Sequence, residues 1–347
     1  MIFTIAGREI GPDHSPFVIC ELSGNHNGSL ERALTMIDAA ADTGCDAIKL
    51  QTYTADTLTL PSDGPGFRIE DGPWAGRTLH DLYAEAYTPY DWHAALFERA
   101  RQRGVTIFST PFDDTAVDLL ESLGAPAYKI ASFEAVDLPL IARVAACGKP
   151  MIISTGLASL AEMAEALETA QVGGAAGVAL LHCVSAYPAP IDEANVRTVP
   201  DLARRFGVVT GLSDHTPGTV ASVAAVALGA AIIEKHFTLA RADGGPDAAF
   251  SLEPAEFTAL VRDCKAAWSA LGSATYDDLG SERAAAGHRR SLYVAADVAA
   301  GELLRPANVR SVRPGYGLAP KHLAEVIGRR AARDLKFGEP LAWDMLA

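Results

Sequence analysis

The chain has 347 residues, of which 49% are hydrophobic, so it can form one large domain and a smaller one around buried cores. Its net charge of −14 argues against a nucleic-acid or anionic-membrane binder, because such proteins need a basic surface. Five scattered cysteines without a CxxC pair favour free thiols in a reducing cytoplasm. We also see no signal peptide and no apolar run that would span a bilayer, so we expect a cytoplasmic protein without a membrane partner.

Short β-branched runs alternate along the chain with Ala- and Leu-rich amphipathic runs. We expect strands at 17–22, 46–51, 105–109, 127–131, 150–154, 178–182, 208–212 and 231–234. Helical patterns lie at 30–43, 89–103, 114–123, 137–146, 160–171, 196–205, 218–228 and 254–271. Eight strand–helix units over residues 17–271 are typical of a (β/α)₈ TIM barrel. A doubly wound open sheet is the alternative, but residues 23–28 (SGNHNG) are not the GxGxxG loop that such a sheet would need.

Two regions stand apart from this alternation. Residues 53–88 are rich in Gly, Pro and aromatic residues, and a loop of this length predicts a lid or a wall of the substrate site. After Gly272 the composition changes, so we expect a barrel domain over 1–271 that includes an N-terminal hairpin, a linker over 272–287, and a small domain of short mixed elements over 288–347.

All eight expected strands end in polar or ionisable residues, whereas their opposite ends are mostly Gly, Ala, Pro and Val. Catalytic groups of (β/α)₈ barrels lie at the C-terminal ends of the strands. The strand ends carry Glu21, Lys49, Gln51, Ser109, Thr110, Lys129, Ser132, Ser154, Thr155, His182, Ser213, Asp214, His215, Glu234, Lys235 and His236. This distribution predicts a single polar pocket at that end of the barrel.

Two histidines, His215 and His236, end the neighbouring seventh and eighth strands. Because neighbouring strands lie about 5 Å apart, both imidazoles can reach one metal ion. Two histidines completed by water and substrate oxygens suit Mn²⁺, Fe²⁺, Co²⁺ or Zn²⁺. The alternative is that each histidine only satisfies a hydrogen bond in the core.

Two lysines are expected to point into the barrel. Lys129 shares its side of the strand with Ala127 and Ala131, and Lys49 is a similar case. A buried lysine is costly unless it meets an anion, so with hydroxyls beside it we expect a phosphate-bearing substrate. The hydroxyls end strands three, four and five, at Thr110, Ser132 and Ser154. The alternative is that such a lysine pairs with Glu21 or Glu134.

Ten segments in chain order resemble the bacterial sialic-acid synthase family over nearly the whole chain. They are ELSGNHNG, DAIKLQTY, STPFD, PAYKIAS, IISTG, LLHCVSAYP, GLSDHT, EKHFT, GPDAAFSLEP and RPGYG. The resemblance implies a TIM barrel followed by an antifreeze-like (SAF, β-clip) domain. It also implies condensation of phosphoenolpyruvate with an open-chain amino sugar to a nine-carbon 2-keto acid.

Several segments look most like the pseudaminic branch of this family, although His182 stands where that branch often has lysine. The implied acceptor is 2,4-diacetamido-2,4,6-trideoxy-β-L-altropyranose, and N-acetylneuraminate or legionaminate synthesis is the alternative within the family. Two further readings remain open. One is a metal-dependent barrel aldolase or hydrolase. The other is a non-catalytic carbohydrate-binding or antifreeze-like protein that acts through residues 288–347.

The resemblance also implies roles for matched residues. His215 and His236 match metal ligands, with Mn²⁺ as the expected ion and Mg²⁺ or Co²⁺ as alternatives. The residues matched to phosphoenolpyruvate binding are Lys129, Thr110, Ser132, Ser154, Ser185, Tyr187 and Ser213. Those matched to the sugar are Gln51, Asp247 and Arg313, and the catalytic set is Glu21 and Glu134 for proton transfer, with Lys49. Arg313 would enter the site of a partner subunit, which implies a domain-swapped homodimer.

Overall fold

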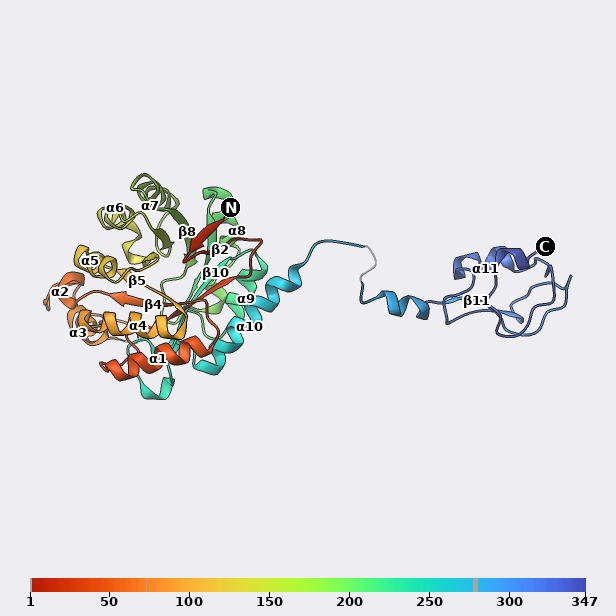
Figure 1. Cartoon of the computed structure of the whole chain (residues 1–347), viewed down its shortest axis with the longest axis horizontal. Coiled ribbons are helices and arrows are strands. Elements are labelled where there is room, and N and C mark those ends of the chain that lie inside the picture. Colours follow the sequence, from red (N-terminus) through yellow and green to blue (C-terminus); the bar gives the residue numbers. More distant parts are fainter. Residues whose placement is uncertain (1, 73, 277–279) are drawn as a thin grey trace. The chain divides into compact units, whose positions relative to one another are not determined.

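The computed structural model describes residues 2–72, 74–276 and 280–347 of the chain. These residues form two compact units, Met1–Gly272 and Ser273–Ala347 (Figure 1). Each unit has its own hydrophobic core.

The first unit is built on eight parallel strands that close into a barrel (Figure 1). In chain order they are β3 (Phe17–Glu21), β4 (Ala47–Thr52), β5 (Thr106–Pro111), β6 (Tyr128–Ile130), β7 (Pro150–Ser154), β8 (Gly177–Cys183), β9 (Val209–Asp214) and β10 (Ile232–His236). β10 closes the barrel against β3, with Ile232 opposite Phe17 and His236 opposite Glu21. The (β/α)₈ prediction is therefore confirmed, and the open-sheet alternative is excluded.

One long helix follows each strand on the outside of the barrel. These helices are α1 (Leu30–Asp42), α4 (His93–Arg103), α5 (Asp114–Ser122), α6 (Leu138–Ala145), α7 (Leu160–Val172), α8 (Thr198–Phe206), α9 (Val220–Ala227) and α10 (Pro254–Leu271). Several begin where a side chain caps free backbone N–H groups; Ser159, for example, forms a capping box with Glu162 at the start of α7. α4 and α8 end at Gly104 and Gly207, which adopt the left-handed conformation that glycine tolerates best.

The segment 53–88 is more ordered than the loop that its composition predicts. It contains α2 (Ala55–Leu58) and α3 (Leu79–Ala86), which start at the capping side chains of Thr54 and Thr78. Between these helices the chain folds back on itself, with Leu79 N–H donating to Phe67 O at 2.9 Å. Four glycines and three prolines among the 36 residues of this segment interrupt any long periodic pattern, so the sequence does not indicate such short helices.

The lower part of the barrel interior is apolar. Side chains on alternate positions of each strand point inward, and here they pack against Phe3, Ile5 and Ile10 of the hairpin β1 (Phe3–Ile5) and β2 (Arg8–Ile10). A Cβ added to Gly211 of β9 would lie 2.1 Å from the Ile232 carbonyl oxygen, so only glycine fits at that point. The hairpin thus closes the N-terminal end, and the open end is the one where the strands finish.

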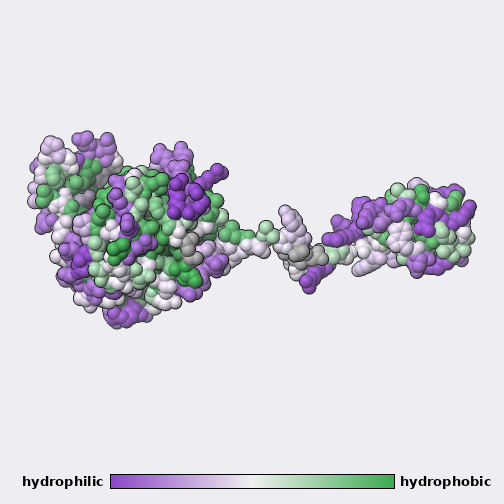
Figure 2. All heavy atoms as spheres, turned by 90° about the horizontal axis from the view of Figure 1, so that it is seen from above, coloured by the Kyte–Doolittle hydropathy of each residue, from purple (hydrophilic) through white to green (hydrophobic). Residues whose placement is uncertain are grey.

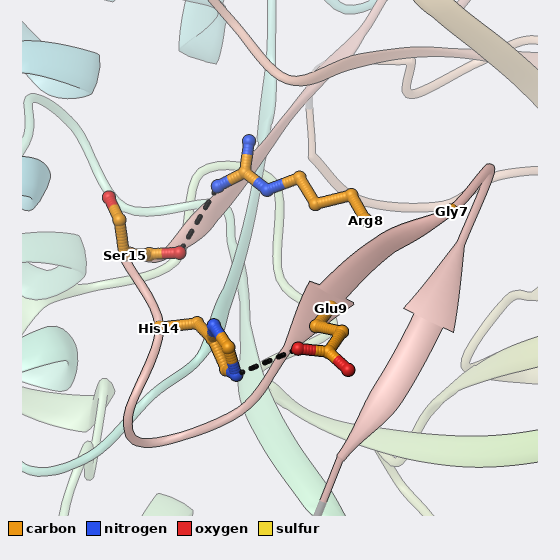
Figure 3. Close-up of a pocket in the computed structure, with 5 residues that line it drawn as sticks. All are labelled: Gly7, Arg8, Glu9, His14 and Ser15. Carbon is orange, nitrogen blue, oxygen red and sulfur yellow. Dashed lines mark hydrogen bonds and ion pairs between the residues drawn. The ribbon is translucent and has the colours of Figure 1, made fainter.

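A shallow pocket lies beside this hairpin, away from the strand ends (Figure 3). It is lined by Gly7, Arg8, Glu9, His14 and Ser15. The Arg8 guanidinium pairs with Asp46 and donates to Ser15 O at 3.1 Å, and His14 lies 3.6 Å from Glu9. These polar groups already have partners, so the pocket does not present a set of free functional groups.

The second unit consists of short elements around a small apolar core. β11 (Ser291–Val294) and β12 (Val309–Val312) pair antiparallel, and α11 (Leu323–Val326) is a single helical turn. Within the expected linker 272–287, a 3₁₀ helix begins at Arg283 and runs to His288, and positions 277–279 lie outside the described residues.

Figure 2 shows hydrophobic and hydrophilic residues mixed on the visible surface of the first unit. Across the described ranges, no helix combines the length and apolar character needed to cross a membrane.

Candidate active site

A ring of eight side chains, one from each strand, lies just above the apolar interior of the barrel. Each ring residue follows an inward-facing position of the lower barrel by two residues, so the period of two places it inside as well. The ring consists of Glu21, Lys49, Thr110, Lys129, Ser154, Cys183, Ser213 and Glu234, all of them buried. Apart from Cys183, these side chains carry charges or hydroxyl groups that require partners.

The two lysines of the ring share Glu234. Lys49 Nζ lies 2.7 Å from Glu21 Oε2, 3.4 Å from Glu234 Oε1 and 3.2 Å from Thr110 Oγ1. Lys129 Nζ donates to Ser154 Oγ at 2.6 Å and lies 3.9 Å from Glu234 Oε1. The suggested pairing of an inward lysine with Glu21 therefore occurs for Lys49. The Glu134 alternative does not describe Lys129, whose ion pair among the described residues is with Glu234.

Glu234 is the central residue that our sequence-based site assignment omitted. It also accepts a hydrogen bond from Ser213 Oγ at 3.2 Å. Burial raises the pKa of Glu234, but Lys129 and Lys49 outweigh this effect and hold the pKa below its ordinary value. Burial lowers the pKa of Lys129, so its ammonium would be stabilised by an added anion. The sequence could have predicted that Glu234 points into the barrel, because it follows the inward-facing Ile232 by two residues on the same strand.

The two histidines lie one step above the ring, beside each other. Their ring centroids are 5.3 Å apart. His215 Nδ1 donates to the Val184 carbonyl oxygen at 2.9 Å, so in the neutral imidazole the lone pair lies on Nε2. His236 Nδ1 is buried and, within the part of the chain that the structure describes, has no hydrogen-bond partner.

This pair of imidazoles fits a divalent cation. An unsatisfied buried nitrogen on His236 and a free lone pair on His215 are the ligands that such an ion needs. Asp247 Oδ2 lies 3.9 Å from His236 Nδ1. The described residues contain no group of three or more His, Cys, Asp or Glu side chains placed to hold a metal, so substrate or water would complete the coordination.

The side chains matched to phosphoenolpyruvate lie in contacting pairs around the mouth. Ser132 Oγ and Ser185 Oγ are 2.8 Å apart, and both approach Gly156 after β7. A Cβ at Gly156 would lie 2.2 Å from Ser185 Oγ, so glycine is needed for this approach. Tyr187 lies with its ring centroid 4.4 Å from that of His215. Lys129 Nζ donates to Ser154 Oγ at 2.6 Å, so an ammonium and a hydroxyl stand together where an anionic group could be bound.

The residues matched to the sugar divide between the two units. Gln51 Nε2 lies 3.4 Å from Ser23 Oγ, and Ser23 Oγ donates to Asp247 Oδ2. Gln51 and Asp247 therefore meet through Ser23 on the side of the mouth near His236. Arg313 belongs to the second unit, where its side chain is exposed.

The two expected proton-transfer carboxylates differ in their surroundings. Glu21 is paired with Lys49 and accepts a hydrogen bond from Ser23 N–H at 3.0 Å. Glu134 lies in the 3₁₀ helix Phe133–Val136, and no described residue provides a hydrogen-bond partner for its buried Oε2. Burial raises the pKa of Glu134 to about 7. One oxygen of this carboxyl is therefore unpartnered among the described residues, and near pH 7 the group can both accept and release a proton.

Several strand-end residues, among them Ser109, His182, Asp214 and Lys235, point away from the mouth, contrary to the single pocket that we expected. His182 Nε2 lies 2.8 Å from Ala194 O, and Lys235 pairs with Asp214 at 2.9 Å. Each is one position out of phase with the ring, so the period of two turns it toward the helices. The departure at His182 from the pseudaminic pattern thus lies outside the mouth.

Comparison with known proteins shows the family to which this chain belongs. The model of the NeuB family matches residues 36–276, and that of the SAF domain matches residues 289–347. The chain belongs to the NeuB family. Both matches agree with the fold expected from the sequence, a barrel followed by an antifreeze-like domain.

The relatives within this family are similar over almost their full length. A pseudaminic acid synthase of Campylobacter jejuni subsp. jejuni is 44% identical over 95% of this chain and 96% of its own. One of Helicobacter pylori is 42% identical over 95% and 97%. An N,N'-diacetyllegionaminic acid synthase of Legionella pneumophila is 34% identical over 96% and 95%. Among solved structures, an N-acetylneuraminic acid synthetase of Leptospira borgpetersenii has a TM-score of 0.74 and 31% identity, over 82% of this chain and 95% of its own.

Proposed function

We propose that this chain condenses phosphoenolpyruvate with 2,4-diacetamido-2,4,6-trideoxy-β-L-altropyranose and water to give pseudaminic acid and phosphate. The observation that carries this proposal is the 42–44% identity to pseudaminic acid synthases over 95% of the chain. The lower identity of 34% to the legionaminic enzyme makes legionaminate synthesis the weaker alternative. The barrel mouth supports the reaction because it combines buried cations, hydroxyls and a pair of imidazoles.

Phosphoenolpyruvate would bind on the Lys129 side of the mouth. The ammonium of Lys129 and the hydroxyls of Ser154, Ser132 and Ser185 would receive its phosphate and carboxylate oxygens. Thr110 beside Lys49, Ser213 beside Glu234 and Tyr187 beside His215 would complete the contacts to phosphoenolpyruvate, with Tyr187 lying between the two substrates. These contacts would hold C3 of phosphoenolpyruvate toward the aldehyde carbon of the open-chain sugar, so that positioning supplies much of the rate.

A divalent cation would be held by His215 and His236, and when bound it would supply Lewis-acid polarisation of the sugar's aldehyde. Mn²⁺ is our choice of ion, with Mg²⁺ or Co²⁺ as alternatives, because imidazole with oxygen ligands suits such ions. Asp247 and Gln51 would orient the sugar hydroxyls beside this pair.

Proton transfer falls to the carboxylates of the mouth. In the reaction C3 of phosphoenolpyruvate forms the new carbon–carbon bond, water adds at C2, and phosphate leaves with cleavage of the C–O bond. We assign removal of the water proton to Glu134, because its Oε2 has no partner among the described residues. Glu21 and Lys49 would stabilise the charge that develops beside them, since they already form a buried pair.

We propose further that the protein acts as a domain-swapped homodimer in which Arg313 enters the partner subunit's site. Residues 288–347 carry ten Lys/Arg against six Asp/Glu, a net +4, whereas the whole chain is at −14. Electrostatic attraction would therefore favour placing this unit on an acidic barrel. Exposed apolar side chains also follow the adjacent strands β6, β7 and β8, at Phe133, Leu157, Leu160 and Ile191. A partner subunit would cover them.

We propose that the reaction takes place in the cytoplasm, because the five cysteines are free, as is usual for proteins of a reducing compartment. The aldolase or hydrolase alternative is weaker because it would use no phosphoenolpyruvate, unlike the synthases to which the chain is similar. The carbohydrate-binding alternative is weaker because it would not need the buried ring of charges in the barrel.

The test is to incubate the protein with phosphoenolpyruvate and Mn²⁺, offering the altrose sugar, 2,4-diacetamido-6-deoxymannose and N-acetylmannosamine in parallel. Product mass and released phosphate are measured for each. We expect turnover of the altrose sugar and its loss on addition of EDTA. Turnover of another sugar alone would show that the acceptor is that sugar and not the altrose sugar. If no sugar gave released phosphate, the synthase assignment would be overturned.

A further inference from the structure

The tip of the segment 53–88 reaches the mouth of the barrel through Trp74. Residues 67–72 and 75–79 lie against each other, with Ile69 N–H bonded to Arg77 O at 2.9 Å, and Trp74 directly precedes the second of these ranges. The Trp74 indole N–H donates to Pro246 O at 2.8 Å, next to Asp247. Its ring centroid lies 5.9 Å from that of Tyr187. One side chain therefore touches the loops that follow both β8 and β10.

Trp74 extends an aromatic surface that borders the two histidines. Tyr187 lies 5.4 Å from Phe250 and 4.4 Å from His215 between ring centroids, and Phe250 lies 5.1 Å from His236. The only hydrogen-bond donor of the indole is already bound to Pro246 O, so the remaining surface of Trp74 is apolar. The side of the mouth that carries Asp247 is thus partly lined by rings rather than by hydrogen-bonding groups.

We propose that Trp74 is a specificity-determining residue that, with Tyr187, forms an apolar wall for a methyl-bearing substituent of the acceptor sugar. This inference rests on the proposed function. The altrose sugar carries a methyl group at C6 and an acetamido group at C4, where N-acetylmannosamine carries hydroxyls. An apolar wall gains contact area with the first sugar, and it leaves a hydroxyl of the second without a hydrogen-bond partner.

The size of the effect can be bounded from general chemistry. One methyl-sized group in an apolar pocket changes the specificity constant by roughly 10-fold to 200-fold, and an added hydroxyl is rejected by about 100-fold at most. Trp74 is half-buried and supplies part of the wall, so the lower end of this range applies. We therefore expect loss of the ring to cost about tenfold in kcat/KM for the altrose sugar.

Trp74 has one competing role, which is to anchor the Asp247 loop through Pro246. Two substitutions separate the roles. Trp74→Phe keeps an aromatic ring and removes the N–H donor, whereas Trp74→Ala removes both. A matched control exists at Trp268 of α10, whose indole N–H donates to Pro12 O at 3.0 Å. Trp268→Phe removes the same kind of bond to a proline carbonyl, but beside the N-terminal hairpin.

The experiment measures kcat and KM for the altrose sugar, N-acetylmannosamine and phosphoenolpyruvate in wild type and all variants. We expect Trp74→Ala to raise KM for the altrose sugar about tenfold and to leave KM for phosphoenolpyruvate unchanged. Trp74→Phe and Trp268→Phe should stay within about threefold of wild type. If Trp74→Ala does not fold, as judged by its thermal transition, Trp74→Leu takes its place.

The outcomes distinguish this inference from the proposed function. If wild type turns over the altrose sugar but Trp74→Ala keeps the same KM, the wall is wrong and the synthase assignment stands. Equal losses in Trp74→Phe and Trp74→Ala would overturn the wall in favour of the anchor. If wild type turns over no sugar, the proposed function fails, and the inference fails with it.

Discussion

Glu234 and Lys235 are neighbours on β10, yet they belong to two different buried ionic networks on opposite faces of the barrel wall. Outside, Lys235 Nζ lies 2.9 Å from Asp214 Oδ2 and also donates to Thr216 O. Asp214 in turn accepts hydrogen bonds from Thr216 N–H at 2.8 Å and from Ser222 Oγ at 2.6 Å. The outer network is therefore satisfied by the protein itself.

The inner network is not satisfied in this way. Across the residues that the structure describes, Glu234 Oε2, Glu134 Oε2 and His236 Nδ1 are buried without a hydrogen-bond partner. Unpartnered buried polar atoms cost free energy, so they persist where they serve a ligand or a reaction. Buried charge alone therefore does not mark a catalytic site. What separates the two networks is whether the protein has left partners to be supplied by substrate.

The largest expected effect comes from removing an inner ligand. His236→Ala should lower kcat/KM by at least about 10³-fold, because the Lewis acid that it helps to hold contributes several kcal/mol. The protein should remain folded: the variant loses ring packing against Phe250 and His215, but His236 Nδ1 has no hydrogen bond to lose among the described residues. Steady-state kinetics and calorimetry on the same sample test this. A large fall in stability with full activity would place His236 in the structural network instead.

The matching change in the outer network should act on stability. Lys235→Met leaves the Asp214 carboxylate buried without its cation, which should lower the free energy of unfolding by about 3–5 kcal/mol. The folded fraction should keep kcat within a few-fold of wild type, because Lys235 faces away from the mouth. Chemical denaturation with activity assays below the transition would check both parts. If kcat collapsed while stability held, the outer network would share in catalysis.

The smallest effect concerns pH. Burial raises the pKa of Glu134 to about 7, so its carboxylate form, the one able to accept a proton, disappears as pH falls through that value. We expect kcat to fall about tenfold per pH unit below about pH 7. The residual activity of Glu134→Gln should lack this acidic limb. A limb that survives unchanged in Glu134→Gln would assign the proton transfer to another group, with Glu21 the next candidate.

Much of this site could be predicted from the chain, because a barrel strand places alternate residues on one face. Lys129 was assigned to the interior from its phase with Ala127, and both are buried in the structure. The same rule turns Ser109, Thr155, His182, Asp214 and Lys235 outward. The prediction of a single pocket is wrong because polar residues at the strand ends alternate between the interior of the barrel and the side that faces the helices.

Other features could not be read from periodicity. The approach of Trp74 to Pro246 joins residues 172 positions apart, and only the fold brings them together. The helices α2 and α3 are short and lie among glycines and prolines, so no long periodic pattern indicates them. Glu234 acquires its importance from two lysines on other strands, and this convergence depends on closure of the barrel.

The most direct test of the distinction between the two networks is a side-by-side measurement of Glu234→Gln and Asp214→Asn, recording phosphate release and the free energy of unfolding for each. We expect Glu234→Gln to lose at least about 10²-fold in kcat/KM, because its carboxylate serves the mouth. It should lose less stability than Asp214→Asn, because Lys49 keeps Glu21 as a partner and burial already lowers the pKa of Lys129. Asp214→Asn should lose about 3–5 kcal/mol of stability and keep its activity while folded. The reverse pattern, an active but unstable Glu234→Gln and a stable but inactive Asp214→Asn, would contradict the account.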